Sequence, residues 1–443
     1  AVDAEARAAA ESVSLPERDA TDLPFITLDP PSAMDLDQAM HLERDGDGFV
    51  VHYAIADVAS FVEPGGAVDT EANRRGETLY GADSKVPLHP KPLSEDAASL
   101  LPDQIRPALL WTIRLDAQGN QTDASLERAR VKSTAKLDYA TVQSQIDDSS
   151  ADPMLQLLRE IGELRIALEK ERGGVNLPMP EQEINVADDG TWSLEFRSVL
   201  PVEEWNAQIS LLTGFAAASI MLKGKVGILR TMPPPEEHSV KRLRRTAKGL
   251  GIDWSADVDY PEFIRGLDSS VPAEAAMIVA STTLLRGAGY TAFDGEVPEQ
   301  TVQSALAADY AHVTAPLRRL VDRYALEACV ALCAGEEVPA WVRQALPELP
   351  QTMQESGRKA NTYENAVVDL VEAFSLQGRV GETFTGVVTE VDREEKTKGT
   401  LIVREPAVEA SVRGDDLPVG DEVTATLVTA DPANRQISFE LRA

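Results

Sequence analysis

The hydrophobic pattern of the chain changes near Gly378, and this change constrains the fold more than any other feature. From about residue 25 to 140 the pattern is strand-rich, and apolar residues then recur at helical spacing up to about residue 376. Beyond Gly378, turn residues separate five short alternating segments. These are Thr383–Val391, Thr400–Arg404, Val408–Val412, Glu422–Thr429 and Gln436–Leu441. We therefore expect an α+β core of mixed sheet and helices, followed by a small all-β barrel of five strands.

Three aspartates, Asp29, Asp35 and Asp37, lie within nine residues at the end of an apolar segment. Asp35 and Asp37 alternate on extended chain, so we expect their side chains to share one face, and the Pro-Pro turn after Asp29 can fold that residue back toward them. Carboxylates this close repel one another unless a cation lies between them. Hard oxygen ligands without histidine or cysteine favour Mg²⁺ or Mn²⁺ over zinc. The cluster predicts a metal site that processes phosphate groups.

Two alternatives compete with a metal site at these aspartates. The spacing alone is equally compatible with a solvated acidic turn. A calcium loop of the helix-loop-helix type would need a glycine and a glutamate where Met40 and Gly46 stand, so that alternative fails. The setting favours the metal site over the turn, because Phe49–Ala56 is typical of a buried strand and Asp45–Gly48 of the hairpin that precedes it.

A second group of candidates lies around Arg318 and Arg319. Thr314 suits an N-cap and Pro316 suits a first helical turn, which predicts a helix over 315–334. Both arginines would then lie within its first turns, where backbone N–H groups also attract phosphate. The planar guanidinium suits a phosphodiester under attack, but arginine pairs on a surface are ordinarily just solvated. The residues alone leave both interpretations open.

The net charge of −31 on its own argues against a nucleic-acid partner, because phosphate contacts need local positive charge. Net charge describes solubility and long-range fields, however, and not a lined channel. Basic residues do cluster at Arg318 and Arg319 and again in Val240–Lys248. We interpret the latter helix, and also Arg323, as solvated faces.

Targeting signals and cysteines bear on the compartment. No apolar run approaches the length of a membrane span, and the N-terminus has neither a basic region nor an apolar core. Cys329 and Cys333, the only cysteines, are interpreted as buried core residues. We therefore expect a monomer in the reducing cytoplasm, with no membrane contact.

Six blocks of the chain resemble the ribonuclease II (RNB) family of exoribonucleases and occur in that family's order. They are Thr27–Ala39, Tyr53–Val58, Leu79–Pro90 with Leu93 and Ser94, Glu203–Glu204 with Asn206, Leu229–Arg230, and His312–Arg319. The last block is similar to the family's His-x-Thr-Ser-Pro-Ile-Arg-Arg segment, and the C-terminal barrel looks like an S1 RNA-binding domain of the OB type. The resemblance implies a lead-in over 1–22, an RNB catalytic domain over 23–377 and an S1 domain over 378–443.

The resemblance implies a hydrolytic 3′→5′ exoribonuclease that degrades single-stranded RNA processively to nucleoside 5′-monophosphates. Asp29, Asp35, Asp37 and Gln38 would hold Mg²⁺, with Mn²⁺ as the alternative ion. Asp37 would be the most critical of them for catalysis, and Arg318 would balance charge on the reacting phosphate. Two cations bound there would activate a water and stabilise the leaving oxygen.

The resemblance also implies a set of RNA contacts. Tyr80 takes the place of an aromatic that stacks near the 3′-terminal bases. Glu203 or Glu204 falls where the family reads the ribose hydroxyl, which separates RNA from DNA. Glu364 corresponds to an acid that lines the channel. The remaining implied contacts are Arg230, Thr314 and Arg319.

Four features depart from the family's pattern. Gln38 stands where a fourth aspartate is usual, so we expect weaker metal affinity rather than loss of activity. Asn176 replaces an aromatic that often completes the base clamp, which leaves the size of the end product open. The barrel is net acidic and has only Phe384 and Phe439 as aromatics. Only about twenty residues precede the catalytic segment, so we expect no cold-shock-type RNA clamp ahead of it.

Two rivals to the exoribonuclease stay open. A catalytically weak RNA-binding protein that retains the channel is favoured by Gln38 and by the acidic barrel. A DNA-directed metal nuclease would share the same acidic centre. Histidine-based ribonuclease chemistry is disfavoured, because the five histidines are scattered and only His312 lies in a motif, where we interpret it as structural.

Overall fold

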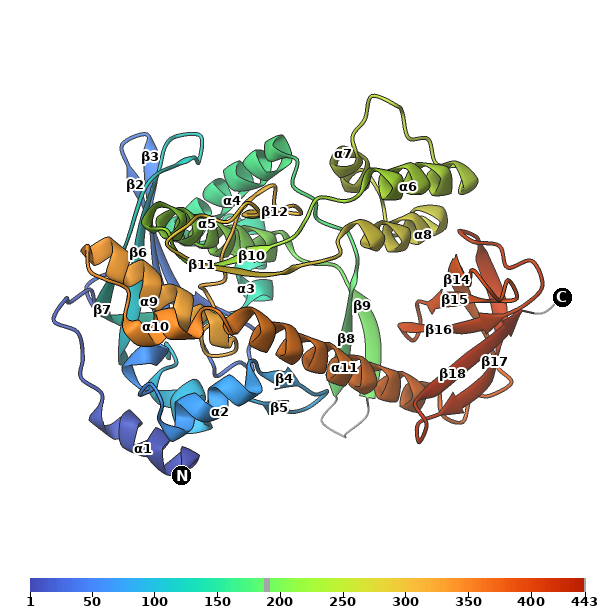
Figure 1. Ribbon diagram of the computed structural model, residues 1–443. Coiled ribbons are helices and arrows are strands. Elements are labelled where there is room, and N and C mark those ends of the chain that lie inside the picture. Colours follow the sequence, from blue (N-terminus) through green and yellow to red (C-terminus); the bar gives the residue numbers. More distant parts are fainter. Residues whose placement is uncertain (187–191, 442–443) are drawn as a thin grey trace.

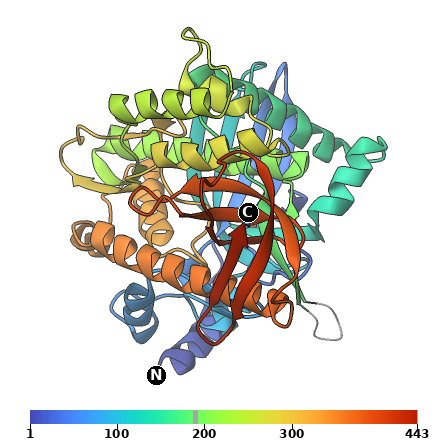
Figure 2. The ribbon, with the colours of Figure 1, turned by 90° about the vertical axis from the view of Figure 1, so that its right-hand side faces the viewer.

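The computed structural model describes residues 1–186 and 192–441 of the 443-residue chain. Two closed five-stranded barrels lie at opposite ends of the molecule, with helices between them (Figure 1). Figure 2, turned by 90°, looks onto the C-terminal barrel with the rest of the chain behind it. The expected α+β class and the C-terminal barrel are confirmed.

The strand-rich N-terminal stretch forms the first barrel. Its strands are β1 (Phe25–Leu28), β2 (Gln38–Asp45), β3 (Gly48–Ala56), β6 (Ile105–Leu115) and β7 (Gln121–Leu137). β1 pairs antiparallel with β2 and parallel with β7, and the parallel pairing closes the sheet on itself. The expected hairpin joins β2 to β3, where Asp45 pairs with Gly48 and Gly46 has a φ of +60°. The pattern predicted the strands but not the closure.

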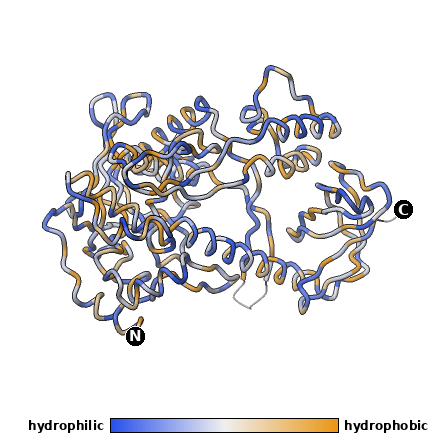
Figure 3. The backbone as a smooth tube through the Cα atoms, viewed as in Figure 1, coloured by the Kyte–Doolittle hydropathy of each residue, from blue (hydrophilic) through white to orange (hydrophobic). Residues whose placement is uncertain are grey.

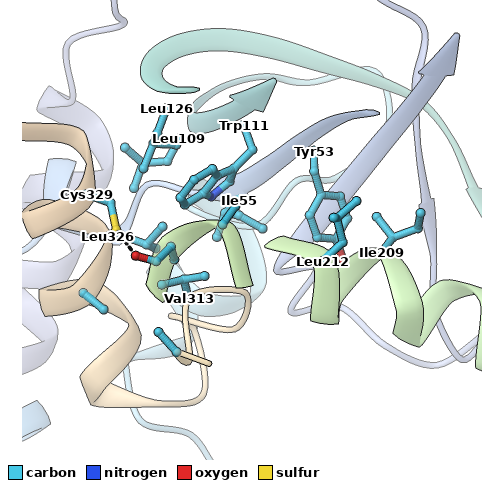
Figure 4. Packing of buried hydrophobic residues seen from close by; sticks show 14 of the residues in the cluster. Tyr53, Ile55, Leu109, Trp111, Leu126, Ile209, Leu212, Val313, Leu326 and Cys329 are labelled. Atoms are coloured by element: carbon cyan, nitrogen blue, oxygen red, sulfur yellow. Dashed lines mark hydrogen bonds between the residues drawn. The ribbon is translucent and has the colours of Figure 1, made fainter. Parts of the chain in front are cut away.

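Two helices cover the first barrel and build the main core. They are α5 (Pro201–Gly224) and α9 (Leu320–Ala334). Figure 4 shows Tyr53 of the barrel beside Ile209 and Leu212 of α5, and Trp111 above Leu326 and Cys329 of α9. α4 (Pro153–Arg172) packs against α5 and ends, as predicted, at a left-handed glycine, Gly173.

α5 is, by length and composition, the one helix in the described part of the chain that could cross a membrane. Half of its most apolar window is buried within the fold. The expectation that no apolar run reaches this length is therefore wrong. Its apolar character has a simpler cause, because the helix lies between the first barrel, α4 and α9 and needs apolar residues on several sides.

The second barrel consists of β14 (Thr383–Val391), β15 (Lys398–Val403), β16 (Val408–Arg413), β17 (Glu422–Asp431) and β18 (Gln436–Leu441). Phe384 and Phe439 form an edge-to-face pair in its core, with ring centroids 5.7 Å apart. α11 (Leu349–Leu376) joins this barrel to the core, and Glu372 near its end accepts hydrogen bonds from the Gln182 side chain and the Glu409 N–H. The barrel is thus fixed to the core by polar contacts as well as by the chain.

The remaining elements lie around these two units. In chain order they are α1 (Val2–Ser12), α2 (Ala67–Arg75), β4 (Leu79–Tyr80), β5 (Lys85–Val86), α3 (Tyr139–Asp147), β8 (Glu181–Val186), β9 (Trp192–Arg197), β10 (Val226–Thr231), α6 (Glu237–Gly249), α7 (Tyr260–Arg265), α8 (Pro272–Ser281), β11 (Gly289–Asp294), β12 (Val302–Gln303), β13 (Ala308–Asp309) and α10 (Ala340–Ala345). Short helical turns cover Val58–Ser60, Leu93–Ala97 and Thr282–Leu284. Figure 3 colours α6 and most of α11 as hydrophilic, which fits surface helices.

Three local interpretations of the sequence are wrong. α9 begins at Leu320 and not near residue 315, because 315–319 form a turn in which the Asp322 carboxylate accepts from the Ala315 N–H at 2.8 Å. Arg323 is buried and ion-paired with Asp69, so it is not a solvated face. Cys333 is exposed, whereas Cys329 is buried as expected.

Candidate active site

The loop between β1 and β2 carries the three aspartates at one end of the first barrel. Asp29 directly follows β1, and its N–H donates to the Leu137 carbonyl at 3.0 Å. Asp37 directly precedes β2, and its carbonyl accepts from the Ala56 N–H at 2.9 Å. Leu36 is fully buried between the two outer positions. Backbone bonds to the barrel and the buried leucine therefore hold the acidic loop in place.

Asp37 meets the Arg318 turn directly. The Leu317 N–H donates to Asp37 Oδ1 at 2.8 Å, and Arg318 Nε lies 3.9 Å from Asp37 Oδ2. The Asp37 side chain is 6% exposed, whereas that of Arg318 is 44% exposed. A phosphate arriving from solvent would therefore reach the guanidinium and the carboxylate at one place.

Burial shapes the ionisation of two of the aspartates. Burial, with a smaller contribution from repulsion by Asp35, raises the pKa of Asp37 to about 8 and that of Asp29 to about 6. Arg318 and the Leu317 N–H oppose the rise at Asp37, because both stabilise its charged form. Carboxylates in such a setting are stabilised as anions by a bound cation.

The third aspartate and Gln38 have other partners. Lys85 Nζ lies 2.6 Å from Asp35 Oδ1, and the Gln38 side-chain amide donates to the Thr314 carbonyl. In the described part of the chain, no three His, Cys, Asp or Glu side chains are already grouped as metal ligands. The expected four-residue ligand set is therefore not assembled. Asp29 and Asp37 are hard oxygen donors that both interact electrostatically with Asp35, and they fit Mg²⁺ or Mn²⁺.

Two residues implied as RNA contacts hold the Arg318 turn. The Arg319 guanidinium makes two hydrogen bonds to the buried Asp322 carboxylate, at 2.9 and 3.0 Å. Thr314 is 3% exposed, and its hydroxyl lies 2.8 Å from that of Ser210. These contacts fix the position of Arg318, and a role of Arg319 and Thr314 in binding RNA stays a prediction.

His312 and Arg230 belong to an aromatic cluster behind this turn. His312 Nδ1 lies 2.8 Å from the Tyr290 hydroxyl, and its ring meets those of Tyr290 and Tyr310 edge-on. Arg230 lies over the Tyr290 ring, with its guanidinium carbon 4.7 Å from the centroid. Burial lowers the pKa of His312 well below its usual value, so it stays neutral. The structural interpretation of His312 agrees with this packing.

Aromatic and acidic side chains from β4 and α11 lie at the rim of the centre. Tyr80 is 40% exposed and Tyr363 is 39% exposed. Burial of its hydroxyl raises the pKa of Tyr80 to about 12, and the charges that act on it include Arg318, Asp37 and Glu364. Tyr80 thus combines an accessible ring with a position beside the acidic centre, and Glu364 lies on the same side. Tyr363 was not predicted from the sequence.

The two glutamates at the start of α5 differ in surroundings. Glu203 accepts from the Leu200 N–H at 2.7 Å and pairs with Arg197 at 2.6 Å, and its charge raises the pKa of Tyr139. Asp29 raises the pKa of the same tyrosine. Glu204 instead faces Glu169, which together with burial raises its pKa. Of the two alternatives, Glu203 lies on the side of the acidic centre.

A cavity of about 900 Å³ lies elsewhere. It is bounded by the β8–β9 hairpin, α8 and the second barrel, with Trp192, Phe196 and Arg404 among its lining residues. No residue of the acidic centre lines it. The candidate catalytic groups are therefore gathered outside this cavity.

The fold and the site define a class of protein. Residues 17–332 match the RNB domain, and residues 382–442 match the C-terminal S1 domain of RNase II-type exonucleases. The chain belongs to the RNB family. The RNB match contains the first barrel with the acidic loop, and the S1 match contains the second barrel.

Individual relatives extend this comparison. The chain is 26% identical over 462 residues to ribonuclease R of Aquifex aeolicus (strain VF5), covering 96% of this chain and 64% of that protein. It spans less than two thirds of the length of the curated relatives it matches most strongly. In fold it is similar to Mycoplasma genitalium RNase R in complex with ribose methylated single-stranded RNA, with a TM-score of 0.87, 21% identity, and coverage of 99% of this chain and 75% of that one.

The same fold also occurs without nuclease activity. Yeast Ssd1, described as a pseudonuclease, matches with a TM-score of 0.74 and 16% identity over 97% of this chain and 54% of that one. The fold is therefore compatible with an active or an inactive nuclease, and activity has to be inferred from the residues of the centre.

Proposed function

We propose that this chain is a metal-dependent exoribonuclease that degrades single-stranded RNA from the 3′ end, processively, to nucleoside 5′-monophosphates. The observation that carries the proposal is the exposed Arg318 guanidinium beside the buried Asp37 carboxylate. Phosphodiester cleavage needs a cation to stabilise charge that develops on the phosphate oxygens, and it needs a site that positions a hydroxide-generating metal. Arg318 supplies the first, and Asp29 with Asp37 supply ligands for the second.

Each side chain of the centre has a role in this proposal. A bound Mg²⁺ or Mn²⁺ would supply an activated water and neutralise charge on the leaving oxygen. The Leu317 N–H holds Asp37 through Oδ1, which leaves Oδ2 on the side of Arg318. Arg318 binds the non-bridging oxygens of the scissile phosphate through its planar fork.

Recognition of RNA follows from the rim. The exposed Tyr80 ring offers a stacking surface for a base near the 3′ end, which every base can use. Glu203, fixed by Arg197, is an acceptor for a ribose 2′-hydroxyl and so would favour RNA over DNA. Both barrel phenylalanines are buried, so within the described part of the second barrel no aromatic ring is exposed for stacking. The core therefore supplies the base contacts.

A catalytically weak RNA-binding protein is the second candidate, favoured by Gln38. Its amide is bonded to Thr314 and adds no charge to the centre, and the fold is shared with a protein described as a pseudonuclease. For either candidate we propose a cytoplasmic monomer without membrane contact, since α5 is a core helix.

One experiment separates the candidates. Single-stranded RNA labelled at the 3′ or the 5′ end, and DNA of the same sequence, are incubated with the protein in Mg²⁺, in Mn²⁺ and in chelator. We expect stepwise mononucleotide release from RNA that requires metal. RNA binding without cleavage in either metal would overturn the proposal in favour of the second candidate. Cleavage of DNA at a similar rate would instead indicate a DNA-directed nuclease.

A further inference from the structure

Lys85 places an ammonium group inside the acidic cluster. Its Nζ lies 2.6 Å from Asp35 Oδ1 and 3.3 Å from Glu95 Oε1. The three side chains are only 15–22% exposed, so the contacts are shielded from solvent more than an ordinary surface ion pair. Lys85 therefore bridges a predicted metal ligand and a glutamate from the Leu93–Ala97 turn.

The backbone fixes this lysine next to the rim of the centre. Lys85 in β5 pairs with Tyr80 in β4, and the Gly81 N–H donates to the Ser84 carbonyl at 2.7 Å to close the hairpin. Asp35, which Lys85 contacts, acts electrostatically on both Asp29 and Asp37. The ammonium thus belongs to the same charged centre as the other two aspartates.

The charges of the centre favour one divalent cation over two. Its carboxylates are Asp29, Asp35, Asp37 and Glu95, and its cationic side chains are Lys85, Arg318 and Lys136, which acts on Asp29. Four negative charges against three positive ones leave one, so a single divalent cation already more than neutralises the centre. Gln38 adds no charge and directs its amide to the Thr314 carbonyl. A second divalent cation would have to displace Lys85 from Asp35.

We propose that Lys85 is a built-in cation of the centre, which holds Asp35 and Glu95 and takes the charge-balancing place of a second metal ion. The chain then binds one divalent cation, through Asp29 and Asp37, where the sequence led us to expect two. This proposal rests on the proposed function, because it concerns the metal that supports RNA hydrolysis. Lys85 acts in it as a positioning residue.

The test is the stoichiometry of Mn²⁺ binding to the full chain, measured by electron paramagnetic resonance and calorimetry without RNA. We compare the wild type with Lys85→Met, with Lys85→Arg, which keeps the charge, and with Lys91→Met. Lys91 is a matched control, because it is exposed and contacts Glu95 at 3.6 Å. We expect one ion per chain for the wild type, Lys85→Arg and Lys91→Met, and two ions for Lys85→Met.

Two ions on the wild type, or a single ion on a folded Lys85→Met variant, would overturn the proposal. Circular dichroism shows whether Lys85→Met folds. If it does not, the wild type and Lys85→Arg still test the proposal, because two ions bound to either of them would contradict it. RNA cleavage measured on the same samples separates this proposal from the proposed function. If the wild type cleaves RNA with two ions bound, only the proposed role of Lys85 is wrong. If it binds one ion but does not cleave RNA, only the proposed exoribonuclease activity is wrong. If it binds no ion, both proposals are wrong.

Discussion

Arg318 Nε lies 3.9 Å from Asp37 Oδ2, although the two residues come from opposite ends of the catalytic core's sequence. The contact is built from both sides. Asp37 is fixed by β2 and by the Leu317 N–H, and Arg318 lies on a turn that Asp322 holds from beneath. The fold thereby places a carboxylate that suits a metal beside a guanidinium that suits a phosphate.

The pH dependence of stability tests the buried carboxylates. The pKa of Asp37 is raised to about 8 and that of Asp29 to about 6, from 3.8, so the folded chain holds protons that the unfolded chain releases. Stability in chelator should therefore fall as pH rises from about 4 to about 8. We expect a loss of several kcal/mol in the free energy of unfolding, measured with urea. Asp37→Asn should lose clearly less, and equal losses would contradict the assignment.

Substitutions at the two adjacent arginines should separate catalysis from stability. Arg318→Ala removes an exposed group that faces the phosphate, so we expect RNA cleavage to slow by about 100-fold or more at nearly unchanged stability. Arg319→Ala leaves Asp322 buried without its partner, so we expect a destabilisation of about 3 kcal/mol or more. Single-turnover cleavage and denaturant unfolding measure the two effects. An Arg319→Ala variant that is as stable as the wild type but cleaves RNA slowly would give Arg319 the role assigned to Arg318, and would contradict the structure.

Tyr80→Ala should weaken binding of single-stranded RNA. Loss of one stacked base costs about 1–3 kcal/mol, or roughly 5- to 150-fold in affinity. Fluorescence anisotropy with chelator present measures binding without cleavage. Tyr80→Phe is the control, because it retains the ring and should bind like the wild type. Equal affinity of Tyr80→Ala and the wild type would show that the ring does not stack on RNA.

Gly214 in α5 tests the packing behind the Arg318 turn. A Cβ at this position would lie 2.1 Å from Tyr310 Cε2 and 2.7 Å from the Ala311 carbonyl oxygen. Alanine normally favours a helix over glycine, yet here we expect Gly214→Ala to destabilise the fold by about 1–3 kcal/mol. Gly249→Ala, where nothing lies within 4 Å, should be neutral or stabilising. The melting temperatures of the two variants measure these effects. A Gly214→Ala variant that is more stable than the wild type would contradict the packing.

The sequence predicted the parts of the fold that depend on local pattern. The alternation of the C-terminal strands and the hairpin at Gly46 depend on neighbouring residues, and both are confirmed. Closure of the first barrel depends on pairing between β1 and β7, which are far apart in the chain and leave no local signal. The resemblance, and not periodicity, linked Asp37 to Arg318.

Two of the differences from the expected structure have their physical origin in ion pairs. Asp322 captures the Ala315 N–H and the Arg319 guanidinium, so the helix starts later than Thr314 suggests. Lys85 of the β4–β5 hairpin contacts Asp35, which lies 50 residues earlier in the chain, and spacing in the sequence cannot show that contact. Buried charges find partners wherever the fold provides them, which a linear pattern does not encode.

The most direct test of the centre is cleavage of 5′-labelled single-stranded RNA by the wild type and by Asp37→Asn in Mg²⁺, with RNA affinity measured on the same samples. Asparagine keeps the shape and can still accept from the Leu317 N–H, but it removes the charge. We expect a ladder of progressively shortened RNA with the wild type. With Asp37→Asn we expect the rate of cleavage to fall by about 1000-fold or more while the affinity for RNA stays similar. A ladder of comparable rate from Asp37→Asn would contradict the account.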